Sequence, residues 1–141
     1  MTYQEMVDLL RSYRAAHEAV TKIDEKIKEL RARHESVKEI LYTDMPRGSM
    51  KDSDLSDYIA ELDELERKLS RAVWEYRREE RQVVAIITAV EDPTQQQLLT
   101  LRYLLFHTWE TVADELGYSY RQVFRIHREA ITGLIGKDGI E

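Results

Sequence analysis

Three arginines near the C-terminus are spaced for one side of a helix. Arg121, Arg125 and Arg128 are separated by four and then three residues, and helical residues three or four apart are neighbours on one face. A guanidinium fork can pair bidentately with O6 and N7 of guanine, and it can also bind phosphate oxygens. The chemistry that these residues offer is therefore recognition of duplex DNA.

Neighbouring side chains extend this predicted contact. Tyr120 can touch a thymine methyl or a phosphate, and Gln122 can bond adenine. Base contacts are predicted for Tyr120, Arg121, Gln122 and Arg125. Backbone contacts are predicted for a second set, which offers hydroxyl, ring N–H or cationic groups: Thr108, Ser119, His127 and Arg128.

Charge is distributed unevenly along the chain. The 141 residues carry a formal net charge of −6, whereas Ser119–Ile131 contains three arginines and one glutamate, giving +2. Because few phosphates would be neutralised, counterion release contributes little to affinity. DNA binding by this chain therefore requires a second contact, such as a dimer on paired half-sites.

The residues before and after Gly117 predict two short-linked helices. Thr108 is the predicted N-cap of the first helix and Ser119 of the second, where Gln122 completes a capping box. Gly117 lies at a turn that requires positive φ. The predicted buried positions are Trp109, Val112, Ala113, Leu116, Val123, Ile126, Ala130 and Ile131. This joint spacing favours a helix-turn-helix, whose second helix enters the major groove, over a plain three-helix bundle.

Two long amphipathic helices must precede this module. Apolar residues recur at steps of three and four from Met6 to Leu41 and from Leu55 to Val90, interrupted only by His34 and Glu79. Such heptads are typical of coiled coils. We predict an all-α protein in which residues 1–91 form a long antiparallel helical hairpin with its loop at about 43–53. Residues 92–141 form a three-helix domain, and Asp92 and Pro93 end the second helix. The hairpin is predicted to form a homodimer or to bind a partner.

A family resemblance follows from the segment LRYLLFHTWETVADELGYSYRQVFRIHREAI, Leu101 to Ile131. It resembles region four of sigma-70-type factors, the promoter-reading region, through LRY, VADELGYS and the run ending in RIHREAI. Trp109 replaces a usual serine, and no segment resembles the sigma region that melts the −10 element. With its helical N-terminal part, the chain resembles phage late-transcription regulators of the RinA and ArpU type, small activators of packaging, structural or lysis genes.

The resemblance implies a function and a partner. It places Tyr120, Arg121 and Arg125 at base-reading positions, although Tyr120 departs from the polar or charged residue often found there. It implies double-stranded DNA and host RNA polymerase as partners, in the cytoplasm of a bacterial host. Trp109 and Phe124 are interpreted as core or partner contacts rather than base stackers.

Other classes of protein fit the sequence less well. Four scattered histidines (His17, His34, His107 and His127), no cysteine and no phosphate-binding glycine loop give no support for an enzyme, a metal site or a cofactor. The N-terminus has no apolar run for a signal peptide or a membrane span. Two alternatives stay open: a small-terminase-like DNA-packaging protein, which would form rings, and a C-terminal bundle that binds only protein.

Overall fold

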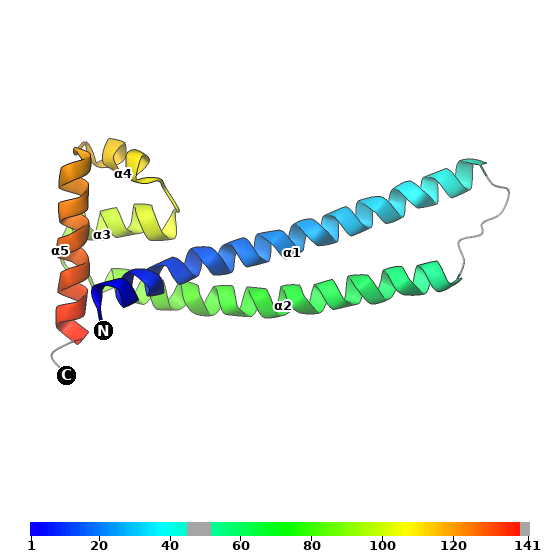
Figure 1. Cartoon of the computed structure of the whole chain (residues 1–141), viewed down its shortest axis with the longest axis horizontal. Coiled ribbons are helices and arrows are strands. Elements are labelled where there is room, and N and C mark those ends of the chain that lie inside the picture. The colour runs from blue at the N-terminus through cyan, green and yellow to red at the C-terminus, as the bar shows by residue number, and fades with distance from the viewer. Residues whose placement is uncertain (45–51, 139–141) are drawn as a thin grey trace. The chain divides into compact units, whose positions relative to one another are not determined.

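The computed structural model describes residues 1–44 and 52–138, and these form helices without any strand. The elements are α1 (Tyr3–Asp44), α2 (Asp52–Thr88), α3 (Pro93–Leu99), the π-helical turn η1 (Thr100–Leu104), α4 (Trp109–Leu116) and α5 (Tyr120–Asp138) (Figure 1). The prediction of an all-α chain is confirmed. The predicted loop at about 43–53 lies largely at residues 45–51, outside the described residues.

The chain divides into two compact units. The first comprises Met1–His17 and Tyr76–Glu141, and the second comprises Glu18–Glu75. This division differs from the predicted boundary after residue 91, because both the beginning of α1 and the end of α2 belong to the first unit. Residues far apart in sequence therefore contribute to one core.

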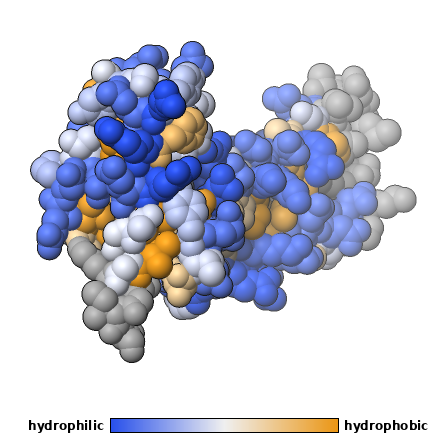
Figure 2. Space-filling model, turned by 60° about the vertical axis from the view of Figure 1, so that its left-hand side comes forward, coloured by the Kyte–Doolittle hydropathy of each residue, from blue (hydrophilic) through white to orange (hydrophobic). Residues whose placement is uncertain are grey.

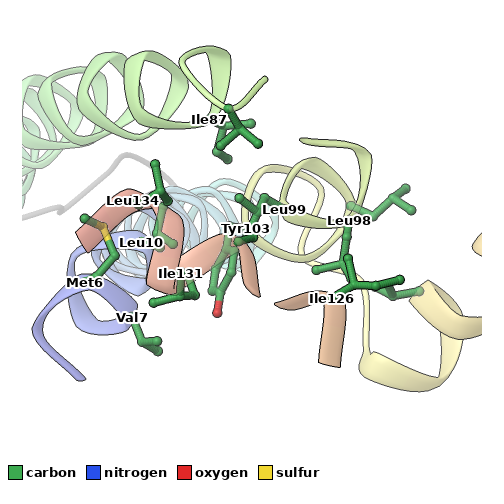
Figure 3. Packing of buried hydrophobic residues seen from close by; sticks show 14 of the residues in the cluster. Met6, Val7, Leu10, Ile87, Leu98, Leu99, Tyr103, Ile126, Ile131 and Leu134 are labelled. Carbon is green, nitrogen blue, oxygen red and sulfur yellow. The ribbon is translucent and has the colours of Figure 1, made fainter. Parts of the chain in front are cut away.

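The core of the first unit is built from every helix that enters it (Figure 3). α5 packs against both α3 and α4. The beginning of α1 contributes Met6, Val7, Leu10 and Tyr13, the end of α2 contributes Val83 and Ile87, and Val90 comes from the link between α2 and α3. The remaining buried apolar residues come from α3 to α5: Leu98, Leu99, Leu101, Tyr103, Val112, Ala113, Val123, Ile126, Ala130, Ile131 and Leu134. The predicted buried face of α5 is therefore confirmed at its four positions.

The connection between α2 and α3 differs from the prediction. α2 ends at Thr88, before Asp92, and Gln96 Nε2 donates to the carbonyls of Ile87 at 3.2 Å and Thr88 at 3.4 Å. These carbonyls have no partner further along the helix; the Val90 N–H also donates to the Ile87 carbonyl at 3.1 Å, so the following backbone and a side chain of α3 together satisfy the end of α2. Asp92 does not end α2 but caps α3, since its carboxylate accepts the Gln95 N–H at 3.0 Å.

The segment after η1 is held by aromatic contacts. Phe106 has φ +59°, a conformation that is strained for a bulky residue. The centroid of its ring lies 5.3 Å from the centroid of the Tyr13 ring and 5.2 Å from that of the His17 ring. Tyr13 stacks on Tyr76 at 5.2 Å and their hydroxyls are hydrogen-bonded at 3.0 Å. Burial of Phe106 against these rings offsets the strain of its backbone.

The second unit contains the rest of α1 and α2. Arg31 pairs with Glu66 at 3.2 Å, and His34 stacks on Tyr58 at 3.8 Å. Higher numbers in α1 thus meet lower numbers in α2, so the two segments run antiparallel within this unit. Ile27 and Leu30 are buried, but the predicted seam positions Val37 and Leu55 are exposed. Burial of the seam is therefore incomplete.

Candidate nucleic-acid interface

α4 and α5 are each started by the predicted cap and are joined by a tight turn. Thr108 Oγ1 accepts the Thr111 N–H at 3.2 Å, which caps α4. Gly117 closes α4 with φ +71°, and the Tyr118 N–H donates to the Ala113 carbonyl at 3.1 Å. A left-handed residue after a helix favours glycine because it lacks a Cβ. The local geometry predicted around Thr108 and Gly117 is confirmed.

The predicted capping box at the start of α5 is also present, and it engages the side-chain amide oxygen of Gln122. Ser119 Oγ accepts the Gln122 N–H at 3.3 Å, and Gln122 Oε1 accepts the Ser119 N–H at 3.0 Å. Bidentate pairing with adenine needs both the amide oxygen and the amide nitrogen of a glutamine. Base contact through the Gln122 oxygen would therefore compete with the cap, which leaves its amide N–H groups for DNA.

The exposed face of α5 presents the three arginines. Arg121, Arg125 and Arg128 are exposed, and within the described part of the chain no hydrogen bond or ion pair involves their side chains. An open groove runs over this face, lined by Arg121, Gln122, Phe124, Arg125, Arg128 and Glu129. Unpaired guanidinium groups on an open surface are available to an anionic or hydrogen-bond-accepting ligand.

Two aromatic rings flank the arginines on the side of α5 nearest α4. Tyr120 and Phe124 are stacked at 6.3 Å with 18° between their planes, and they are 49% and 46% exposed. Phe124 also lies 5.0 Å from the Trp109 ring of α4. The interpretation of Phe124 as a core or partner contact is compatible with this half-exposed position, and the i, i+4 spacing from Tyr120 is the sequence signal that places the two rings together.

His127 is a correction to the predicted interface. It is only 6% exposed, and its two ring nitrogens are hydrogen-bonded to tyrosine hydroxyls: Nε2 to Tyr103 at 2.7 Å and Nδ1 to Tyr3 at 3.1 Å. The prediction that His127 contacts a phosphate is wrong, because this ring faces the core. Burial, with the nearby charges of Arg102 and Arg11, lowers the pKa of His127 to about 4.

Arg102 is a structural residue that sequence reasoning did not single out. Its guanidinium lies 4.5 Å from the centre of the Trp109 ring and donates to the His107 carbonyl at 2.9 Å. Burial lowers the pKa of Arg102, and the charges of Arg11 and Arg14 act in the same direction. The cation–π contact therefore ties η1 to the beginning of α4.

The exposed side of α4 is acidic. Glu110, Asp114 and Glu115 are exposed. Local desolvation, followed by the negative charges of Glu110 and Asp114, raises the pKa of the Tyr120 hydroxyl. These two carboxylates therefore act electrostatically on the start of α5, and a polyanion bound there would feel the same negative field.

Most of the face shown in Figure 2 is hydrophilic, with hydrophobic residues in separate patches. No described helix is long and apolar enough to cross a membrane. Within residues 1–44 and 52–138, no group of three or more histidine or carboxylate side chains is arranged to hold a metal ion. The arginine face of α5 is the candidate binding site.

Comparisons with known proteins gave no match. No protein-family model, curated protein or solved structure matched this chain.

Proposed function

We propose that this chain is a sequence-specific DNA-binding transcriptional regulator in which α4, the turn at Gly117 and α5 act as a helix-turn-helix. In that arrangement the second helix places its first turns in the major groove, and the first helix crosses the DNA backbone. The observation that carries the proposal is the exposed face of α5, where three arginines with no hydrogen bond or ion pair to any other described residue follow a capped helix start.

The roles of the residues follow from their exposure and hydrogen bonds. Arg121 and Arg125 read guanine, with Tyr120 beside them, whereas Arg128 lies farther from the helix start and binds phosphate. Thr108 and Ser119 are exposed, so their hydroxyls can meet the DNA backbone while retaining their capping bonds. Gln122 contributes through its amide N–H groups. His127 is not part of the contact.

Arg121→Ala and Arg125→Ala are each expected to weaken sequence-specific binding by about 1–3 kcal/mol and to relax specificity at one base pair. The measurement is fluorescence anisotropy with a duplex obtained by sequence selection. Arg77→Ala is the matched control, because Arg77 is an exposed arginine of α2. Equal affinity of wild type and both α5 variants for the selected duplex would rule out the recognition-helix proposal.

Neutralising the acidic side of α4 is expected to increase affinity. Asp114→Asn and Glu110→Gln remove negative charge that the proposed geometry places near the DNA backbone. For exposed charges at ~0.2–1 kcal/mol each, we expect tighter binding by about 1.5- to 5-fold per substitution, with a smaller gain at high salt. Glu25→Gln, on an exposed position of α1, serves as the control. Unchanged or weaker binding at low salt would place α4 away from the phosphates.

The helical region before residue 92 supplies the second contact in this proposal. The antiparallel contacts of α1 and α2 within the second unit, together with exposed Val37, Leu55 and Ile59, support a hairpin that forms a homodimer or engages host RNA polymerase. The resemblance to RinA- and ArpU-type regulators supports a phage late-gene activator in the bacterial cytoplasm. A strict monomer by light scattering, together with no binding to host polymerase, would contradict both forms of the second contact.

A DNA-packaging role of the small-terminase kind is the second candidate. It uses the same arginine face, but for a packaging site rather than a promoter. Assembly state separates the two: a ring of eight or more subunits would favour packaging, and a monomer or dimer would favour transcription. Sequence selection with and without host RNA polymerase tests the transcriptional role directly, because an activator that works with polymerase binds its site more tightly in its presence.

A further inference from the structure

Tyr120 and Phe124 form a stacked pair on the surface of α5. The base and phosphate contacts proposed for the arginines give this pair no role. Both side chains lie in the first two turns of α5, and each is close to half exposed. Phe124 contacts Trp109 on one side and Tyr120 on the other, so its position is set by neighbours. Its exposed part lines the same groove as Arg121 and Arg125.

We propose that Tyr120 and Phe124 form an apolar reader for the 5-methyl group of a thymine adjacent to a guanine contacted by Arg121 or Arg125. In the major groove, the methyl group of thymine is the apolar feature of the base edges, and apolar side chains recognise it by contact. This inference rests on the proposed function. It adds thymine to guanine as a base that α5 recognises.

The surroundings of the pair favour DNA over a protein as its partner. Three arginines that pair with no residue in the described part of the chain lie beside it along α5, and a protein surface that covered the rings would have to neutralise their charges. In the proposed arrangement, the first turns of the second helix are the part that faces the bases. Two rigid aromatic side chains also lose little conformational entropy when they bind, since each has only two χ angles.

Replacing thymine by uracil in the selected duplex tests this inference, because it removes the methyl group and keeps the Watson–Crick and Hoogsteen edges. Each thymine is replaced in turn, and affinity is measured for wild type, Phe124→Ala, Tyr120→Ala and Val84→Ala. Val84 is an exposed apolar residue of α2 and serves as the control. We expect a loss of about fourfold at one or two adjacent positions for wild type and the control.

The aromatic variants should no longer distinguish thymine from uracil at those positions. The wild-type scan needs no variant to fold, and circular dichroism of Phe124→Ala and Tyr120→Ala shows which of them can be compared. If no single uracil weakens wild-type binding while Arg121→Ala still does, the methyl reader is overturned and the DNA-binding function stands. The reader is also overturned if both folded variants keep the full discrimination. If wild type shows no sequence preference at all, the proposed function fails, and this inference fails with it.

Discussion

Leu10→Ala is expected to lower the free energy of unfolding of the unit that contains α5 by about 2–5 kcal/mol. Leu10 lies in α1, yet it is completely buried in the cluster that includes Ile131 and Leu134 of α5 (Figure 3). Truncation removes apolar contacts and leaves a cavity that the packed core only partly fills. The effect should therefore reach residues more than a hundred positions away in sequence.

Tryptophan fluorescence offers a local measurement of this effect. In a Trp74→Phe background, Trp109 of α4 is the remaining tryptophan, so urea unfolding followed by fluorescence reports on the first unit. Leu55→Ala, at an exposed apolar position of α2, is expected to change the free energy of unfolding by less than about 0.5 kcal/mol. An unshifted Trp109 transition in Leu10→Ala would mean that residues 92–141 fold independently of α1.

Stability is expected to fall by about 3 kcal/mol between pH 7 and pH 4 through His127 alone. The pKa of His127 is lowered to about 4 in the folded protein, first by burial and then by the positive charges of Arg102 and Arg11. In the unfolded chain the histidine has its ordinary pKa of about 6.5. Between these two pKa values the unfolded state binds a proton that the folded state does not. The contribution of His127 to the free energy of unfolding is therefore fully present above about pH 6.5 and is lost as the pH falls toward 4.

The geometry around His127 explains why protonation is unfavourable. A neutral imidazole has one N–H and one acceptor nitrogen, which suits a pair of hydroxyls in which one accepts and the other donates: those of Tyr103 and Tyr3. Burial raises the pKa of Tyr103 to about 12, so its hydroxyl stays neutral and supplies no negative charge to offset the positive charge of an imidazolium. Among the described residues, the charges that lower the pKa of His127 are both cationic, those of Arg102 and Arg11.

Two measurements check this expectation. NMR titration should show the His127 ring signals unchanged from pH 8 to about pH 5, and a His127 pKa above 6 would contradict the assignment. His127→Gln keeps one donor and one acceptor but does not titrate, so the difference between its unfolding free energy and that of wild type isolates the histidine from the carboxylates. That difference should shrink as the pH falls from 6.5 to 4.

The amino-acid sequence alone was sufficient for features that depend on contacts within three or four residues. The caps at Thr108 and Ser119, the left-handed Gly117 and the exposed arginines of α5 follow from local hydrogen bonding, backbone conformation and helical periodicity. The long helices follow from the same periodicity. Each of these features depends on residues that are close in sequence, so it could be predicted without knowing which distant segments are in contact.

Tertiary structure decided which residues of α5 face a ligand and which face the core. His127 lies beside Arg128 in sequence and has the polar chemistry of a DNA contact, but Tyr3, from the other end of the chain, and Tyr103 enclose it. Phe124 has the chemistry of a core residue, yet Trp109 and Tyr120 leave half of it exposed beside Arg121 and Arg125. Periodicity specifies the direction of a side chain on its helix, but burial depends on which other segment covers that direction, and this is a non-local property of the fold.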